Sequence, residues 1–235
     1  MRKLFLFILL AVVVAGYSKP SKKVAAVRNS VASVLVFKNG ELLRSGLGVF
    51  VGADGSFFSS YSLFVDGDSA VAIDNRGVAR PILKVLGADE TYDCVRLSVL
   101  PDKKMKVVEF SSLPAVKGDA LHMVSYGVKK SGAIAEAAVE KVDTVSGSYL
   151  YYTLRLPANE KSVAAPLVNA NGELVALLQP VAGGDTMRSH ALAANYVKSL
   201  SIKAKDYSSG RFARIGIKKA LPENEEALLP LMALQ

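Results

Sequence analysis

Few residues in this sequence can perform acid–base or nucleophilic chemistry. Its 235 residues include two histidines, His122 and His190, and one cysteine, Cys94. Histidine is the side chain that most readily exchanges a proton near neutral pH, so a serine or cysteine hydrolase would normally use one of these two as its base. Cys94 has apolar neighbours beyond Asp93, which predicts a small buried core residue rather than a reactive thiol.

Ser162 follows a lysine, Lys161, and a desolvated lysine can act as the base of a Ser–Lys pair. The run Glu160-Lys161-Ser162 is polar, however, which favours a solvated loop. No spacing of histidine, cysteine or glutamate is typical of a zinc site, and no glycine-rich loop has the phosphate-binding pattern. The sequence therefore predicts neither a metal nor a cofactor.

The elements around Ser162 are those of a loop that leads into a β-hairpin. Residues 166–169 predict a strand, Asn171-Gly172 predicts a tight turn whose two central positions need φ > 0, and residues 174–178 predict the returning strand. Turn residues recur about every 8 to 12 positions elsewhere, which favours a sandwich or barrel over βαβ units. A strand and bend are predicted at residues 56–64, and a closing helix at 195–203. Further strands are predicted at residues 31–37, 42–51, 70–73, 78–86, 91–100, 121–126, 132–145, 149–156 and 189–194.

The stretch from residue 159 to 179 resembles the segment that carries the nucleophile in trypsin-like serine proteases of the HtrA type. That family has Gly-Asn-Ser-Gly-Gly-Pro-Leu-Val-Asn before a hairpin, and this sequence has Lys-Ser-Val-Ala-Ala-Pro-Leu-Val-Asn. Val163 therefore occupies the position of the nucleophilic serine, and Ala164 and Ala165 replace the paired glycines. The resemblance covers about residues 30 to 203.

The same resemblance locates the other two triad positions. Ser59-Ser60-Tyr61-Ser62-Leu63 stands where the family has Thr-Asn-x-His-Val, so Ser62 occupies the histidine position. Residues 91–100 resemble the family's Thr-Asp-Leu-Ala-Leu-Leu-Lys-Ile, which places Asp93 at the aspartate position. A hydroxyl cannot accept and return a proton near neutral pH, so the base and the nucleophile are both replaced. We expect Asp93 to accept backbone N–H groups or the Ser62 hydroxyl instead.

The resemblance leaves no intact catalytic residue set. Ser162 lies one residue from the nucleophile position, so a one-residue slip of the loop would present it as a substitute. The resemblance places His122 on an interior strand of the second barrel and His190 on the strand that borders the substrate pocket. Neither position suits a base for Ser162, and loss of protease activity is the expected outcome.

The resemblance implies an all-β fold of two antiparallel β-barrels with a short helical extension. The expected boundaries are a signal peptide at residues 1–15, the N-terminal barrel at 16–112, the C-terminal barrel with its closing helix at 113–203, and the extension at 204–235.

The first 16 residues have the three parts of a secretory signal peptide: Met1-Arg2-Lys3, an apolar run at residues 4–15, and a small-residue exit. The run is shorter than the roughly 20 residues that span a bilayer. We expect cleavage near Ala15 or Gly16, no stable membrane span afterwards, and a periplasmic or secreted protein. An uncleaved short anchor is the alternative.

The formal net charge is +8, and it falls to +6 when Arg2 and Lys3 leave with the signal peptide. Clustered lysines can meet acidic polymers. No aromatic residues interleave these lysines as a base-stacking surface requires, so solvated faces are favoured and no nucleic-acid partner is expected. A single cysteine excludes an internal disulfide framework.

Three functions remain open from the sequence. The first is an inactive protease homologue that binds protein or peptide segments, and the second is a weak serine endopeptidase that uses Ser162. The third is a structural subunit that docks a partner through an apolar tail, although the tail could equally pack on its own barrel. The tail residues are Leu228, Leu229, Leu231, Met232 and Leu234.

Overall fold

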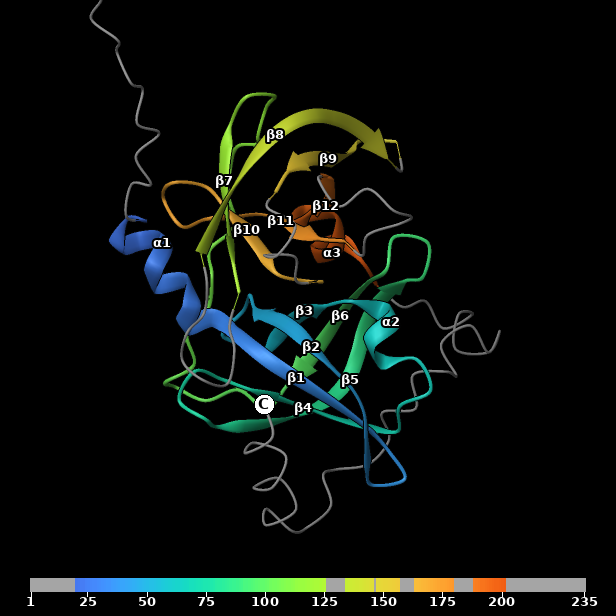
Figure 1. Ribbon diagram of the computed structural model, residues 1–235. Coiled ribbons are helices and arrows are strands. Elements are labelled where there is room, and N and C mark those ends of the chain that lie inside the picture. The colour runs from blue at the N-terminus through green and yellow to red at the C-terminus, as the bar shows by residue number, and fades with distance from the viewer. Residues whose placement is uncertain (1–19, 126–133, 146, 157–162, 180–187, 202–235) are drawn as a thin grey trace, which may run out of the picture.

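The computed structural model describes residues 20–125, 134–145, 147–156, 163–179 and 188–201 (Figure 1). The expected signal peptide, Ser162 with its neighbour Lys161, and the expected extension at 204–235 lie outside the described residues. The described chain forms two closed antiparallel barrels, one above the other in Figure 1. The prediction of an all-β fold with two antiparallel barrels is confirmed.

Each barrel consists of strands that are consecutive in the sequence. The N-terminal barrel closes in the order β1-β2-β3-β6-β5-β4 and the C-terminal barrel in the order β10-β11-β12-β9-β8-β7. The first six strands are β1 Val31–Lys38, β2 Glu41–Phe50, β3 Ser56–Ser59, β4 Ser69–Ile73, β5 Ala79–Asp89 and β6 Cys94–Val99. The second six are β7 Ala120–Val124, β8 Ile134–Val145, β9 Tyr149–Arg155, β10 Pro166–Val168, β11 Leu174–Leu178 and β12 Arg188–Ala193.

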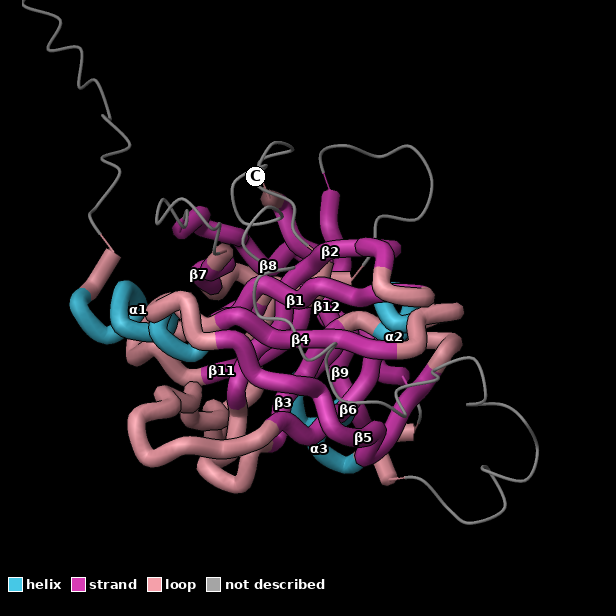
Figure 2. Tube along the Cα trace, turned by 90° about the horizontal axis from the view of Figure 1, so that it is seen from below, coloured by secondary structure: helices cyan, strands magenta, loops and turns pink. Residues whose placement is uncertain are grey.

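Short helices lie at the periphery of the strands, as the view from below shows (Figure 2). They are α1 Lys22–Ala26, continued by a 3₁₀ turn at Val27–Ser30, α2 Tyr61–Phe64 and α3 Ala194–Ser199. The strand and bend predicted over residues 56–64 are present as β3 and, at the bend, as the short helix α2. The predicted closing helix is present as α3 but ends at Ser199, because Leu200 has extended backbone angles.

Helix α3 returns the chain to the N-terminal barrel. The hydroxyl of Tyr196 donates to Asp89 of β5 at 2.6 Å, and the Arg96 guanidinium of β6 donates to the Lys198 carbonyl at 3.1 Å. The backbone of Leu200 lies so close to Gly87 that a Cβ there would be 2.6 Å from the Leu200 carbonyl carbon. A side chain at residue 87 would therefore push the end of α3 away.

The two predicted asparagine–glycine turns have different outcomes. Asn39 and Gly40 have φ values of +54° and +84°, so the predicted tight turn between β1 and β2 is confirmed. At Asn171-Gly172 the prediction of a two-residue turn is wrong, since only Gly172 has positive φ. The Asn169 side chain accepts the N–H groups of Asn171 and Glu173 at 3.0 and 3.1 Å, which supports a longer turn.

The hydrophobic core continues across the junction of the barrels. One cluster joins Val31, Phe58 and Cys94 of the N-terminal barrel to buried residues of the C-terminal barrel such as Leu121 and Tyr152. Cys94 is buried, as predicted, and this burial raises the pKa of its thiol far above the usual value. Among the residues that the structure describes, no helix is long and apolar enough to cross a membrane.

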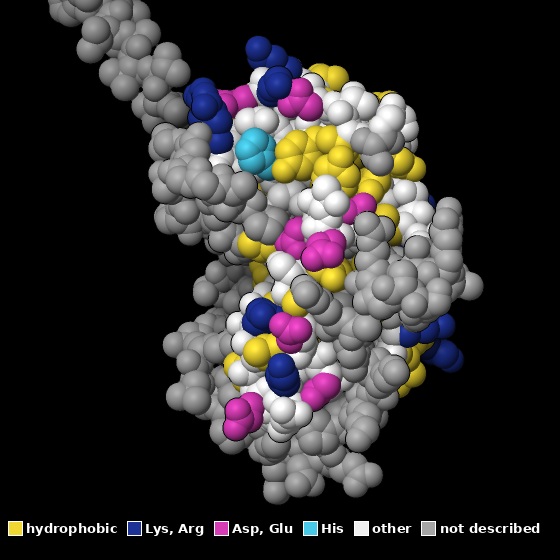
Figure 3. Space-filling view, turned by 90° about the vertical axis from the view of Figure 1, so that its right-hand side faces the viewer, with side chains coloured by type: hydrophobic (Ala, Val, Ile, Leu, Met, Phe, Trp, Pro, Cys, Tyr) yellow, Lys and Arg dark blue, Asp and Glu magenta, His cyan; other side chains and the backbone are white. Residues whose placement is uncertain are grey.

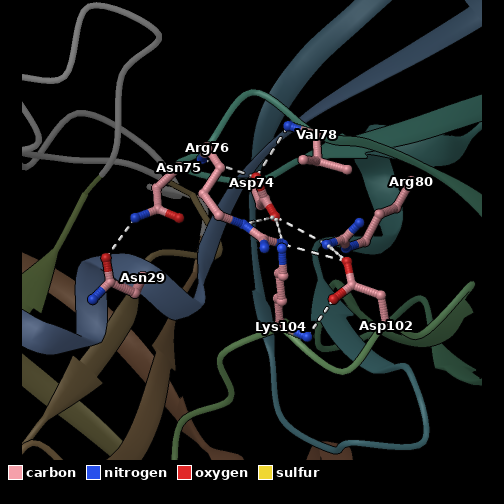
Figure 4. Close-up of polar contacts among 8 residues, drawn as sticks. All are labelled: Asn29, Asp74, Asn75, Arg76, Val78, Arg80, Asp102 and Lys104. Atoms are coloured by element: carbon pink, nitrogen blue, oxygen red, sulfur yellow. Dashed lines mark hydrogen bonds and ion pairs between the residues drawn. The ribbon is translucent and has the colours of Figure 1, made fainter.

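A buried ionic network closes one rim of the N-terminal barrel (Figure 4). Asp74 accepts hydrogen bonds from the guanidinium groups of Arg76 at 2.6 Å and Arg80 at 3.0 Å. Its other oxygen accepts the backbone N–H groups of Arg76 and Val78 at 2.9 and 3.0 Å. Arg80 also donates to Asp102 at 2.5 Å. The network thus connects the β4–β5 turn to the segment that follows β6.

Candidate functional site

Ser62 and Asp93 lie side by side on the N-terminal barrel. Ser62 belongs to α2, which follows β3, and Asp93 to the turn before β6, the strand that pairs with β3. The Ser62 backbone N–H donates to Oδ1 of Asp93 at 2.5 Å, and the Ser62 hydroxyl donates to Oδ2 at 3.0 Å. The hydroxyl of buried Ser60 donates to the same Oδ2 and lies 2.9 Å from the Ser62 hydroxyl.

The Asp93 carboxylate is held in one orientation by these three contacts. Its backbone φ is +43°, a conformation that few non-glycine residues adopt, so the surrounding bonds must keep it there. One oxygen accepts the backbone N–H of residue 62 and the other accepts its side-chain hydroxyl, so Asp93 fixes the orientation of the side chain at residue 62. The side chain that Asp93 orients here is an exposed hydroxyl, as the sequence predicts.

The two histidines lie on strands of the C-terminal barrel. His122 is in β7, opposite Glu136 of β8. His190 is in β12, stacked on Tyr151 with ring centroids 5.5 Å apart, and its Nδ1 lies 3.4 Å from the Thr153 hydroxyl. Within the part of the chain that the structure describes, neither histidine forms a hydrogen bond with Ser62 or Asp93.

Residues 163–165 lead into β10 on the C-terminal barrel. Val163 is 40% exposed, whereas Ala164 and Ala165 are buried. The Ala164 N–H donates to the Leu178 carbonyl at 2.8 Å, and the Leu178 N–H donates to the Ala165 carbonyl at 3.0 Å. Ala164 has φ +63°, in the left-handed region that glycine adopts without strain. The loop therefore keeps a glycine-like backbone although its side chains are methyl groups.

No protein-family model and no curated protein matches this sequence. Solved structures do match. The active form of the Rv3671c protease from M. tuberculosis has 18% identity and a TM-score of 0.62, with 86% of this chain and 87% of that chain covered. The inactive form of the same protease has 18% identity and a TM-score of 0.58, with 83% and 93% covered. The fold is that of trypsin-like serine proteases.

A third similar structure is the HtrA-type protease AlgW with tripeptide. It has 15% identity and a TM-score of 0.62, and the alignment covers 75% of this chain and 60% of that chain. At these identities the likeness concerns the trypsin-like fold alone, and function has to be argued from the site.

Within this trypsin-like fold, the structure brings Ser62 and Asp93 together and places Val163 on the other barrel. Ser162 lies outside the described residues, so its distance from either histidine is not defined. Sequence reasoning missed Ser60 as a third member of the group. The run Ser59-Ser60-Tyr61-Ser62 contained the signal for this group, because the hydroxyls of Ser60 and Ser62 stand on either side of Tyr61, which is buried.

The left-handed Ala164 leads to a stability prediction. We expect Ala164→Gly to leave the free energy of unfolding within about 0.5 kcal/mol of the wild type, since release of the left-handed strain offsets the entropic cost of a glycine and the loss of a buried methyl group. Ala165→Gly is the matched control, because Ala165 is fully buried without positive φ, and it should lower stability by about 1 kcal/mol. Urea unfolding of both variants checks the prediction. The prediction would be contradicted if both variants changed the free energy of unfolding by the same amount in the same direction.

Proposed function

We propose that this protein is an exported, catalytically inactive homologue of trypsin-like proteases that binds protein or peptide segments where the two barrels meet. The observation that carries the proposal is that the Asp93 carboxylate accepts the backbone N–H and the hydroxyl of Ser62, the two residues that the resemblance assigns to the aspartate and histidine positions of a triad. A hydroxyl held in this way cannot relay a proton from a nucleophile to a leaving group.

The loop at Val163 supports loss of catalysis independently. An acyl transfer needs a nucleophile at this place and backbone N–H groups directed at the oxyanion. Val163 supplies no nucleophile, because its side chain is a hydrocarbon. Loss of base and nucleophile together favours a binding protein over a slow enzyme.

The surface near the junction supports binding of a polypeptide. Figure 3 shows hydrophobic side chains gathered on the C-terminal barrel beside a histidine, with acidic side chains below them. Partly buried Tyr149 and Tyr151 belong to β9 of this barrel, and Tyr92 precedes Asp93. Tyrosine is enriched at protein interfaces because it offers apolar area with a polar end. The similar AlgW structure contains a tripeptide, which supports the same ligand class.

The proposal of export depends on the sequence of residues 1–16, whose charged start, apolar run and small-residue exit are typical of a signal peptide. Its test is the intact mass of the protein recovered from the periplasm or medium of an expressing bacterium. A mass that begins at residue 16 or 17 supports export, and an intact Met1 contradicts cleavage.

Inactivity is tested with a fluorophosphonate probe on the purified mature protein, compared with Ser162→Ala. We expect no labelling of either protein and no cleavage of an unfolded substrate, because among the described residues no imidazole bonds to Ser62 or Asp93 and Val163 carries no hydroxyl. Labelling that is lost in Ser162→Ala would instead support the alternative function, a weak serine hydrolase that uses Ser162.

Binding is tested by fluorescence anisotropy with labelled, reduced and carboxymethylated lactalbumin, a permanently unfolded protein. Val163→Arg should weaken binding by more than about tenfold, since an arginine would fill the position of the former nucleophile. Leu83→Arg is the control, because Leu83 is 49% exposed on β5 of the N-terminal barrel. Equal weakening by both variants, or no binding by the wild type, would refute the proposed site.

A further inference from the structure

The segment between the barrels, residues 100–119, has an unusually apolar surface. Nine large hydrophobic residues are exposed in the part of the chain that the structure describes, and four of them belong to this segment. Leu113 is 74% exposed and Leu100 is 59% exposed, and the other two are Val107 and Val116. The other five are distributed over β2, β5 and two loops, so this one connecting segment carries the largest share and is a candidate for a surface that another segment covers.

The same segment contains four lysines against three carboxylates, Asp102, Glu109 and Asp119, and its lysines have no ion-pair partner among the described residues. The lysines are Lys103, Lys104, Lys106 and Lys117. The side chain of Asp102, the nearest carboxylate in sequence, pairs with Arg76 and Arg80 instead. A covering segment should therefore be both acidic and apolar.

A groove of about 390 Å³ lies beside the segment. Phe110 and Leu113 line it from the segment, Leu150 and Leu174 from the C-terminal barrel, and Lys198 from α3. The Lys198 ammonium lies 4.5 Å from the centre of the Phe110 ring, which places a positive charge at the groove. The groove thus offers apolar side chains together with serine hydroxyls and one lysine.

We propose that residues 221–235 of the same chain occupy this groove. They begin with an acidic part that contains Glu223, Glu225 and Glu226, and continue with the apolar part that contains Leu228 and Leu231. This order matches the basic and apolar character of the groove. The proposal does not depend on the proposed function, since it concerns a surface outside the Ser62–Asp93 site.

The length of the connecting segment and the place where it begins favour an occupant from the same chain. The description of the chain ends at Ser201, three residues after Lys198, which lines the groove. Residues 202–220 connect this point to the docking segment and can span up to about 60 Å when extended, far more than the return requires. A tethered segment also acts at a high effective concentration, which a separate partner lacks.

Engineered disulfides test the proposal, because the one native cysteine is buried and its thiol stays protonated. The test pair is Leu113→Cys with Leu228→Cys, and the control pair is Leu83→Cys with Leu228→Cys. Leu83 and Leu113 are both exposed, so neither substitution endangers folding. Under oxidised glutathione the test pair should form an intramolecular bridge more than about tenfold faster than the control pair.

Gel mobility without reductant separates the outcomes. A fast intramolecular bridge in the test pair alone supports docking in the groove. Equal rates in both pairs, or no bridge in the test pair, would overturn the proposal. A disulfide-linked dimer would overturn it as well, since the segment would then dock on a second copy. The triple variant Glu223→Gln, Glu225→Gln, Glu226→Gln should slow disulfide formation in the test pair about fivefold at low salt. At high salt it should have no effect, because the ionic contribution is then screened.

Discussion

Replacing Asp74 with alanine is expected to lower the free energy of unfolding by about 3–5 kcal/mol, the usual cost of removing one partner of a buried ion pair. The Asp74 side chain is 4% exposed and accepts two guanidinium groups and two backbone N–H groups. Without it, Arg80, whose side chain is also 4% exposed, keeps only Asp102 as an anionic partner among the described residues. Urea unfolding measures the change.

The matched control for this prediction is Asp143→Ala. Asp143 pairs with Lys141 at 2.7 Å, but their side chains are 41% and 68% exposed, so the loss should be below about 1 kcal/mol. Equal losses at Asp74 and Asp143 would contradict a special role for the buried network.

The same network predicts sensitivity to acid. The pKa of Asp102 is lowered, first by the backbone N–H of Lys104 and then by Arg80 and Arg76. A carboxylate with a lowered pKa stabilises the fold above its unfolded pKa and loses that contribution as the pH falls through its folded pKa. The loss at this group therefore begins below about pH 4.

The second large effect is expected when a histidine is introduced at residue 62 and a serine at residue 163. We expect the variant Ser62→His, Val163→Ser, Ala164→Gly, Ala165→Gly to react with a fluorophosphonate probe at least about 100-fold faster than the same variant without Ser62→His. The reason is geometric, because Asp93 already presents one oxygen to the backbone of residue 62 and the other to its side chain.

A readout other than reactivity checks the restored geometry. In Ser62→His alone, the new imidazole should have a pKa above its usual value, because the Asp93 carboxylate favours the charged form. NMR titration of the introduced histidine measures the shift, with His122 and His190 as internal references. If the Ser62→His substitution leaves the rate of the restored variant unchanged, the barrels do not place residues 62 and 163 in contact.

The barrel strands were predictable because apolar residues alternate between turn residues. The Asn39-Gly40 turn was predictable because both residues adopt the positive φ that asparagine and glycine favour. At Asn171-Gly172 the outcome depends on the side chain of Asn169, which accepts two N–H groups and extends the turn. The identities of the two turn residues, asparagine and glycine, do not reveal this contribution of Asn169.

Much of the site could not be predicted for a similar reason. The expectation that Asp93 accepts the Ser62 groups followed from the resemblance, but the contribution of Ser60 requires the turn from β3 into α2. The buried network was also missed. Asp74, Arg76 and Arg80 look like surface charges in the sequence, and only closure of the barrel buries two of them beside Asp102.

The return of α3 to the first barrel also constrains the order of folding. All strands of each barrel are consecutive, so each barrel can form from its own part of the chain. Tyr196 and Lys198, in contrast, find Asp89 and Arg96 only when both barrels exist. Docking of α3 is therefore a late kinetic step, and substitutions at Tyr196 should accelerate unfolding while the refolding rate stays nearly constant.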